Sequence, residues 1–272
     1  MLCFKNGKYV EHVSLSDRAF QYGDGCFTTA CVQDGRIQLL SRHLERLNKA
    51  SAALMLQFDQ SILLDTLNIL FQKEFSQAQG TLKVLISRGE GQRGYGFSPT
   101  NIADVYVFFF PSDACIAKYS VLHESDILEN RIGLTMPYLV GVKSLNRLEQ
   151  VILKAEATKR GLNEALVLDI HDRIVEGISS NCFLLLNGEW VTPDLRYNGV
   201  HGIMRAEILD RMLQFNIPHA IRDIDMIEIK DIEALFYCNA LHPMQAVHTL
   251  NRQCLNIEIT KQLFNTLNLD QM

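Results

Sequence analysis

Apolar and polar residues alternate in short runs along much of the chain, as they do in β-strands that bury one face. Several of these runs are joined by dipeptides that favour the tight turns of β-hairpins. The dipeptides are Asn6-Gly7, Asp34-Gly35, His171-Asp172 and Asn187-Gly188. We therefore expect a chain rich in antiparallel strands.

Other segments have the spacing of helices. One helix is expected to begin at Ser41, a residue type that often caps a helix start, and another covers residues 61–75. A third begins near Ser144 and ends at Gly161, and a fourth follows His201-Gly202. The third helix has an apolar stripe that we expect to be buried, formed by Leu145, Leu148, Ile152 and Ala155.

Helices and strands are mixed in both halves of the chain, which predicts an α+β fold. Strands expected at residues 81–87 and 104–110 complete the first half, and strands expected around residues 119–123 and 132–135 open the second. The predicted division is a smaller N-terminal α/β domain over residues 1–113, a linker over 114–120 and a larger C-terminal domain over 121–272.

Composition limits the classes of function. The chain has 272 residues, 47% of them hydrophobic and 21% charged, as in a folded globular protein. A net charge of −5 disfavours binding to nucleic acid or an anionic membrane. The seven cysteines form no Cys-x-x-Cys pair and the histidines no ligand cluster, so we expect reduced thiols and no metal site. With no signal peptide and no apolar run long enough to span a membrane, we expect a cytoplasmic protein.

The segment Gly89–Gly94 matches the Gly-x-Gly-x-x-Gly pattern of dinucleotide-binding proteins. That fingerprint requires a helix to open at its last glycines, where the pyrophosphate binds. Here Gly96, Pro99 and Asn101 follow, and then another strand. We therefore interpret the segment as a glycine-rich loop between strands.

Four segments carry residue types suited to chemistry, although each has an ordinary structural explanation. Lys143 precedes a helix, where most lysines are solvated, and Glu176 stands near a strand end, where carboxylates are usually exposed. Gly202–Arg205 begins a helix, and its backbone N–H groups suit a phosphate. Arg46 lies on a helix, where a surface arginine is the common case.

Taken in order, these segments resemble the fold-type IV enzymes that depend on pyridoxal phosphate (PLP), the family of branched-chain and D-amino-acid transaminases. The resemblance covers nearly the whole chain and implies their two-domain fold. The matching segments are Asp17–Gly25, His43–Leu47, Lys143–Asn146, Val175–Gly177, Ser180-Asn181 and Gly202–Arg205.

The resemblance implies a role for the two central residues. Lys143 would hold PLP as a Schiff base and then act as the proton carrier. Glu176 would pair with the pyridine nitrogen and keep it protonated, so that the ring accepts electrons.

The resemblance also implies a phosphate site. Arg46 would bind the cofactor phosphate with its planar guanidinium, together with the backbone N–H groups of Ile203 and Met204. Asn239 and Ala240 occupy the family's last phosphate-contacting turn. Ala240 replaces a hydroxyl residue there, so it would contribute only its backbone.

Within the family the chain resembles the 4-amino-4-deoxychorismate lyases more closely, which remove pyruvate from aminodeoxychorismate and leave 4-aminobenzoate, a folate precursor. D-amino-acid transaminases carry Tyr-Glu where this chain has Phe27-Thr28, and Arg-x-His where it has Arg93-Gly94-Tyr95. The matching segments are Gly23–Thr29, Ser87–Tyr95, Lys143–Gln150 and Cys238–Pro243.

The lyase resemblance implies that Arg93 binds a substrate carboxylate, with Thr28 and Tyr95 as nearby hydrogen-bonding groups; the alternative for Arg93 is a solvated loop cation. It also implies a homodimer, since the family builds each active site from both chains. An amino-acid transaminase and a catalytically silent PLP-binding protein remain the alternatives.

Overall fold

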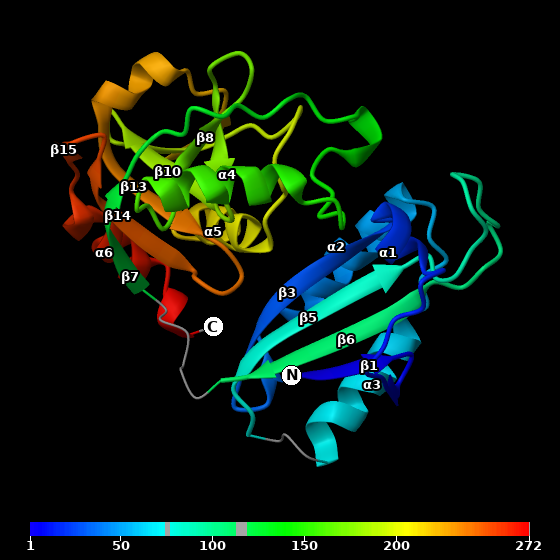
Figure 1. The fold of residues 1–272 in the computed structure, drawn as a ribbon. Helices are drawn as coiled ribbons and strands as arrows, with labels where there is room; N and C mark the ends of the chain where they lie inside the picture. The colour runs from blue at the N-terminus through cyan, green and yellow to red at the C-terminus, as the bar shows by residue number, and fades with distance from the viewer. Residues whose placement is uncertain (74–76, 113–118, 272) are drawn as a thin grey trace. The chain divides into compact units, whose positions relative to one another are not determined.

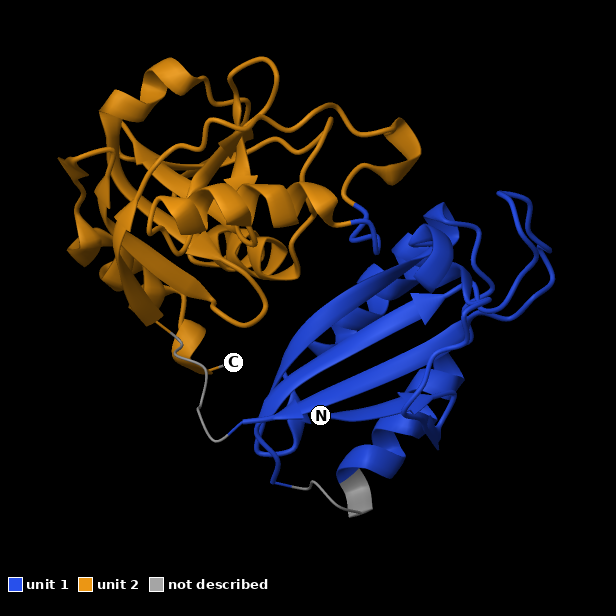
Figure 2. Ribbon diagram, in the orientation of Figure 1, with its two compact units in different colours: residues 1–116, 142–146 blue, residues 117–141, 147–272 orange. Residues whose placement is uncertain are grey.

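The structure, a computed structural model, describes residues 1–73, 77–112 and 119–271. The chain divides into two compact units (Figure 2). Unit 1 comprises residues 1–116 and 142–146, and unit 2 comprises residues 117–141 and 147–272. Each unit has its own sheet and its own buried core.

Unit 1 is built on an antiparallel sheet in the order β2-β1-β6-β5-β3-β4. Helices α2 and α3 cover one face of it (Figure 1). Alternate strand residues such as Val84 pack there against Leu47 and Leu67 of the helices. The elements are β1 (Leu2–Lys5), β2 (Lys8–Tyr9), α1 (Arg18–Tyr22), β3 (Gly25–Gln33), β4 (Arg36–Ile37), α2 (Leu40–Ala53), α3 (Gln60–Lys73), β5 (Gly80–Ser87) and β6 (Asp104–Pro111).

Unit 2 contains a larger sheet in the order β12-β11-β10-β13-β14-β15, with β7 paired to β14, and a separate β8-β9 pair. The strands are β7 (Tyr119–Ser125), β8 (Leu166–Leu168), β9 (Ile174–Gly177), β10 (Asn181–Leu186), β11 (Glu189–Pro193), β12 (His219–Arg222), β13 (Ile232–Cys238), β14 (Met244–Leu250) and β15 (Gln253–Cys254). The helices are α4 (Leu148–Lys159), α5 (Ile203–Gln214) and α6 (Ile257–Thr266), with 3-10 turns η1 (Pro137–Leu139), η2 (Met226–Asp231) and η3 (Leu269–Gln271). The expected α+β class is confirmed.

The predicted hairpins are confirmed. The turn residues Asn6, Asp34, Asp172 and Asn187 all have positive φ angles of 48° to 58°. Asparagine and aspartate tolerate this conformation better than other side chains do, and a glycine follows three of the four. Local turn chemistry was therefore sufficient to locate these connections.

Three local predictions differ from the structure. Helix α2 begins at Leu40, with Leu39 at φ 53° as the capping residue, so Ser41 lies inside the helix. A short helix, α1, interrupts the expected strands, because the Asp17 side chain accepts from the Ala19 N–H and caps its start. The strand expected around residues 132–135 is reduced to an isolated bridge at Ile132.

The prediction for the third helix is wrong in two respects. Helix α4 begins at Leu148, not near Ser144. Its expected buried stripe is largely exposed, with Leu148 at 76% and Ile152 at 56% relative accessibility, whereas Leu153 and Ala157 face the core. Periodicity identified the apolar stripe, but the core of unit 2 lies on another face of the helix.

Contacts group Lys143 with unit 1, although it lies in the sequence range expected to form the C-terminal domain. Residues 113–118, which include most of the expected linker, lie outside the described residues, and residues 119 and 120 belong to β7. The domain boundaries stay a prediction.

Candidate active site

The segment that contains Lys143 is attached to the start of β3. The Phe27 N–H donates to the Lys143 carbonyl at 3.0 Å, and the Leu145 N–H donates to the Gly25 carbonyl at 3.1 Å. Cys26 and Ser144 form an antiparallel bridge between these two bonds. Two motifs separated by more than a hundred residues in sequence therefore form one local structure.

Close contacts explain why positions 23 and 25 are occupied by glycine. A Cβ on Gly23 would lie 2.5 Å from Oδ1 of Asn146, and Gly23 also has a φ of 64°. A Cβ on Gly25 would lie 2.2 Å from the Ile86 carbonyl oxygen and 2.8 Å from Leu145. All three distances are too short for a side chain, so glycine lets the Lys143 segment approach β3 closely.

The Lys143 side chain lies over Phe27. Its Nζ is 4.8 Å from the centre of the Phe27 ring. Phe27 alternates with the buried Cys26 and Thr28 along β3, so its side chain is on the sheet face opposite to the helix-covered core. Lys143 is therefore placed on that second face of the unit 1 sheet.

Arg46 and Thr28 lie on the helix-covered side. The buried Thr28 hydroxyl lies 2.6 Å from Nδ1 of His43, and Arg46 donates to it at 3.5 Å. Burial, with a smaller contribution from Arg46, lowers the pKa of His43 to about 3, so this imidazole is neutral at physiological pH. Thr28 can accept from Arg46 and donate to His43, an arrangement that holds Arg46 in place and argues against direct substrate contact by Thr28.

Glu176 lies in unit 2 with only 6% of its surface exposed. Its Oε2 accepts from the Val200 N–H at 2.9 Å and from Nδ2 of Asn181 at 3.4 Å. Asn181 also donates to the Val200 carbonyl at 2.9 Å. The end of β9, the start of β10 and the loop before α5 therefore hold this carboxylate in one orientation.

Helix α5 begins beside this carboxylate. Gly202 is its N-cap residue and no side chain caps the first turn, which contains Ile203 and Met204. A Cβ on Gly202 would lie 1.8 Å from Oδ1 of Asn181, so only glycine fits there. The prediction that a helix starts at this motif is confirmed, and an uncapped first turn suits an anion.

Asn239 organises the turn after β13. Its Oδ1 accepts from the Leu241 and His242 N–H groups, and its Nδ2 donates to Oγ of Ser180 at 3.1 Å. Ala240 is half-buried in the same turn. The structure thus gives Asn239 a role in shaping the turn, and the phosphate contacts of both residues stay a prediction.

Glu164, a residue that no sequence motif marks, is a carboxylate that is 4% exposed. It accepts from the Ile178 N–H at 2.5 Å and from the hydroxyls of Ser179 and Ser180 at 2.9 and 3.0 Å. Burial raises its pKa even with these donors present. Glu164 therefore holds the turn that joins Glu176 to β10. Its hydrogen-bond partners in this turn are too far along the chain for a local sequence pattern to reveal them.

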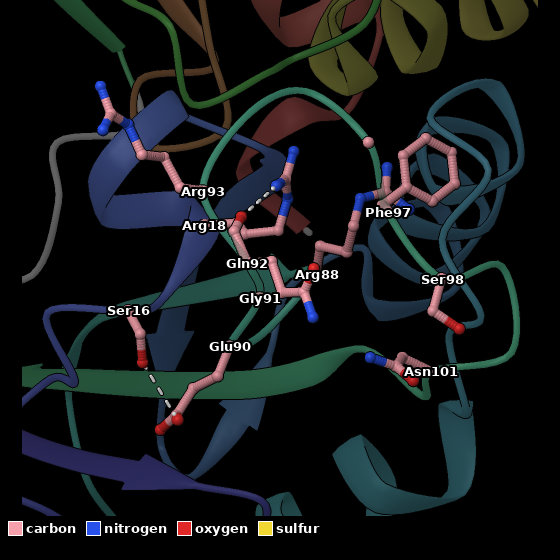
Figure 3. Close-up of a pocket in the computed structure, with 11 residues that line it drawn as sticks. Ser16, Arg18, Arg88, Glu90, Gly91, Gln92, Arg93, Phe97, Ser98 and Asn101 are labelled. Atoms are coloured by element: carbon pink, nitrogen blue, oxygen red, sulfur yellow. Dashed lines mark hydrogen bonds between the residues drawn. The ribbon is translucent and has the colours of Figure 1, made fainter.

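Arg93 and Tyr95 lie on the glycine-rich loop between β5 and β6, which extends beyond the end of the sheet (Figure 1). Tyr95 is 88% exposed. A cavity of about 700 Å³ lies along the loop, and in Figure 3 the Arg93 side chain extends away from Arg88 and Phe97. The loop interpretation of the glycine pattern is confirmed, since β6 and not a helix follows it.

Two buried arginines, Arg18 and Arg88, hold the loop. Arg18 donates to the carbonyls of Gln92 and Gly94. Both Arg18 and Arg88 also donate through Nε to Oδ2 of Asp24, at 2.9 and 2.7 Å. Asp24 and Arg18 belong to the matched segment Asp17–Gly25, and Arg88 belongs to Ser87–Tyr95, but nothing in the sequence showed that the three residues pair.

Residues of the types that could hold PLP occur in both units. In unit 1, Lys143 could supply an amine and the half-buried Arg46 a donor for the phosphate. In unit 2, Glu176 could supply a fixed carboxylate for the pyridine nitrogen, and the uncapped start of α5 could supply further donors for the phosphate. Among the described residues, no group of three His, Cys, Asp or Glu side chains could hold a metal ion. Nor does that part of the chain contain a helix long and apolar enough to cross a membrane.

A model of the class IV amino-transferase family matches residues 25–250, which is most of the chain. The chain therefore belongs to the class IV aminotransferases, a PLP-dependent enzyme family, and the resemblance seen in the sequence is confirmed.

Two relatives bear the name of the lyase. An aminodeoxychorismate lyase from Vibrio harveyi is 32% identical over 245 residues, which cover 87% of this chain and 86% of the relative. The crystal structure of 4-amino-4-deoxychorismate lyase from Pseudomonas aeruginosa superposes with a TM-score of 0.86 at 35% identity, covering 99% of each chain. A hypothetical aminotransferase from Mycobacterium tuberculosis in a PLP-bound form has a TM-score of 0.79 at 18% identity, covers 100% of each chain and shares the fold.

Proposed function

We propose that this chain is a PLP-dependent lyase that eliminates pyruvate from 4-amino-4-deoxychorismate and leaves 4-aminobenzoate. The observation that carries the proposal is the similarity to two proteins with this name, one of them over 99% of both chains. The attachment of Lys143 to β3 and the fixed orientation of Glu176 support it.

Lys143 and Glu176 have separate tasks in this proposal. When bound, PLP supplies an electron sink for charge that develops on the carbon bearing the substrate amine. Lys143 Nζ removes the proton from that carbon, acting as the general base. Glu176 would hold a proton at the pyridine nitrogen, and the hydrogen bonds from Val200 and Asn181 fix the orientation of its carboxylate.

The overall reaction balances without a second substrate. A proton leaves the ring carbon, and the bond between the ring and the enolpyruvyl oxygen breaks with its electron pair on the oxygen. The ring becomes aromatic, and the released fragment takes up a proton to become pyruvate. No 2-oxo acid acceptor is consumed, which separates this reaction from transamination.

Arg93 is the proposed partner of one substrate carboxylate, with Tyr95 as a nearby hydrogen-bonding group. Both residues are exposed on a loop that extends past the sheet. Buried arginines hold the loop backbone in place. The contact of Arg93 with the carboxylate is therefore pre-organised, and less ordering is needed when the substrate binds. In this proposal Thr28 accepts a hydrogen bond from Arg46 and so helps to hold that side chain in place.

We also propose that the enzyme is a homodimer. Helix α4 carries four exposed apolar residues in the single chain: Leu148, Val151, Ile152 and Ala155. Exposed apolar groups at helical spacing are costly in water and typical of surfaces that a partner covers. A second copy of the chain is the occupant we propose.

Two assays test the function. Purified protein with PLP is given aminodeoxychorismate alone, and the release of 4-aminobenzoate and pyruvate in equal amounts is expected. In a parallel reaction, conversion of an amino acid plus 2-oxoglutarate, with no 4-aminobenzoate from aminodeoxychorismate, would identify a transaminase instead. PLP binding without turnover of either substrate would identify a silent PLP-binding protein.

A further inference from the structure

Two turns of unit 2 leave its sheet side by side, one before β10 and the other after β13. These strands are antiparallel neighbours, with Asn181 directly opposite Cys238. The first turn, residues 178–180, runs into β10 at Asn181, and the second, residues 239–242, follows β13 directly. The turn that orients Glu176 therefore borders the turn proposed to contact the phosphate.

Glu164 lies against the first of these turns, just before β8. Its Oε1 accepts from the Ile178 N–H, and its Oε2 accepts from the hydroxyls of Ser179 and Ser180. A Cβ on Gly177 would lie 3.0 Å from the same Oε1, closer than side chains normally approach. Glycine at position 177 therefore lets this carboxylate approach the backbone that connects Glu176 to β10.

Ser180 connects Glu164 to the second turn. Because its hydroxyl donates to Glu164, its lone pairs are left to accept from Nδ2 of Asn239, at 3.1 Å. The other end of the Asn239 side chain accepts from the N–H groups of Leu241 and His242. One buried carboxylate thus sets the direction of a series of hydrogen bonds that ends in the backbone of the second turn.

We propose that Glu164 is a positioning residue for the cofactor, acting on Glu176 through the first turn and on the phosphate contact through Ser180 and Asn239. This inference rests on the proposed PLP chemistry. Burial raises the pKa of Glu164, whereas its hydrogen-bond donors favour the ionised form. Such a carboxylate is costly to bury, and a role in holding two parts of one site accounts for its presence.

Glu164→Gln is a sharp test because every bond that the carboxylate makes in this turn is an accepted one. If the new NH2 group faces Ile178, it opposes a backbone N–H, and if it faces Ser179 and Ser180, both hydroxyls must reverse. Ser180→Ala is milder, because it removes the connection to Asn239 and leaves the bonds from Ile178 and Ser179 in place.

The alternative is that Glu164 only stabilises the fold of unit 2. Glu156→Gln is the matched control for this alternative. Glu156 also accepts from two backbone N–H groups, those of Glu129 and Asn130, but that turn carries no proposed site residue. Loss of such a carboxylate should lower the melting temperature without changing the affinity for PLP.

The experiment uses the full chain. PLP is titrated into each variant to obtain its Kd, and the melting temperature is taken without PLP. We expect Glu164→Gln to raise the Kd of PLP by about tenfold to a hundredfold, the range found when the outer partners of metal ligands are removed. Ser180→Ala should also raise it. The double variant should raise the Kd by less than the product of the two single effects, because both changes break one series of hydrogen bonds.

A second measurement reports on Glu176. The absorbance of bound PLP is followed against pH, and Glu164→Gln should move its midpoint to higher pH. A less protonated pyridine nitrogen no longer disfavours a positive charge on the nitrogen that joins PLP to Lys143. Ser180→Ala and Glu156→Gln should keep the wild-type midpoint.

The outcomes separate the two proposals. A wild type that takes up no PLP, or whose PLP absorbance borohydride does not bleach, refutes the cofactor chemistry itself. A Glu164→Gln variant with a lowered melting temperature but the wild-type Kd and midpoint refutes the positioning role alone. If Glu164→Gln does not fold, Ser180→Ala decides, and an unchanged Kd of PLP in that variant refutes the connection to the phosphate turn.

Discussion

Asp24→Asn should destabilise the protein far more than the loss of an ordinary ion pair. Asp24 Oδ2 accepts from Nε of both Arg18 and Arg88, at 2.9 and 2.7 Å. The two arginines are only 4% and 7% exposed, so water cannot replace the lost carboxylate. The amide of asparagine has nearly the same shape but leaves two buried guanidinium groups without their counter-charge.

Removing one partner of a buried ion pair typically costs about 3–5 kcal/mol. For domains of this general size each kcal/mol lowers Tm by about 2–4 °C, so the expected loss is roughly 6–20 °C. Arg18 also holds the loop carbonyls of Gln92 and Gly94, so the variant should raise KM as well.

Circular dichroism is the suitable measurement, because the single tryptophan, Trp190, belongs to unit 2 and would report poorly on unit 1. The control is Glu45→Gln, which breaks an exposed pair with Lys49 and should cost no more than about 0.5 kcal/mol. If both variants lose the same small amount, under about 1 kcal/mol, the reasoning about burial is refuted.

The lowered pKa of Asp24 makes the free energy of unfolding depend on pH. Burial by itself raises the pKa of Asp24, but the hydrogen bonds from Arg88 and Arg18 bring it below its usual value. A lowered pKa means that the contribution to stability is complete above the unfolded-state pKa of about 3.9 and is lost as pH falls through the folded-state pKa. The stability difference between wild type and Asp24→Asn should therefore shrink in acid. A difference that grows in acid would contradict the assignment.

Four further variants test the site and the assembly. Lys143→Ala should abolish both turnover and the PLP absorbance that borohydride bleaches, and peptide mapping that finds the label on another lysine would contradict the assignment. Glu176→Gln should keep bound PLP but lose most turnover, because an amide stabilises a pyridinium cation poorly; wild-type rates at saturating PLP would refute this role. Arg93→Ala should lower kcat/KM by about one to three powers of ten, and unchanged kinetics would make it a solvated loop cation. Val151→Asp should yield monomers in sedimentation if α4 is the dimer surface, whereas an unaltered dimer would place the interface elsewhere.

Local chemistry made much of the fold predictable. Asn6-Gly7 and Asn187-Gly188 specify hairpins because their backbone preferences do not depend on distant residues. The start of α5 was predictable for the same reason. Ser41 shows the limit of such reasoning, since Leu39 in a left-handed conformation begins the helix two residues earlier than a capping serine at position 41 would.

The candidate site was predictable only as far as family motifs could be read along the chain. Lys143 and Glu176 stood out by their place in an ordered set of segments. Asp24 and both its arginine partners lie in matched segments, but the partners are six and 64 residues away in sequence, and their pairing could not be read along the chain. Such long-range partners leave no periodic signal.

The turns, most of the strands, the start of α5 and the segments that carry the chemistry could be predicted from the sequence alone, because they depend on backbone preferences and on residues close together in the chain. Tertiary packing, by contrast, is what turns the apolar stripe of α4 away from its core. Tertiary packing also brings the Lys143 segment against the glycines beside Asp24. These features depend on which distant surfaces pack together, and periodicity carries no information about that choice.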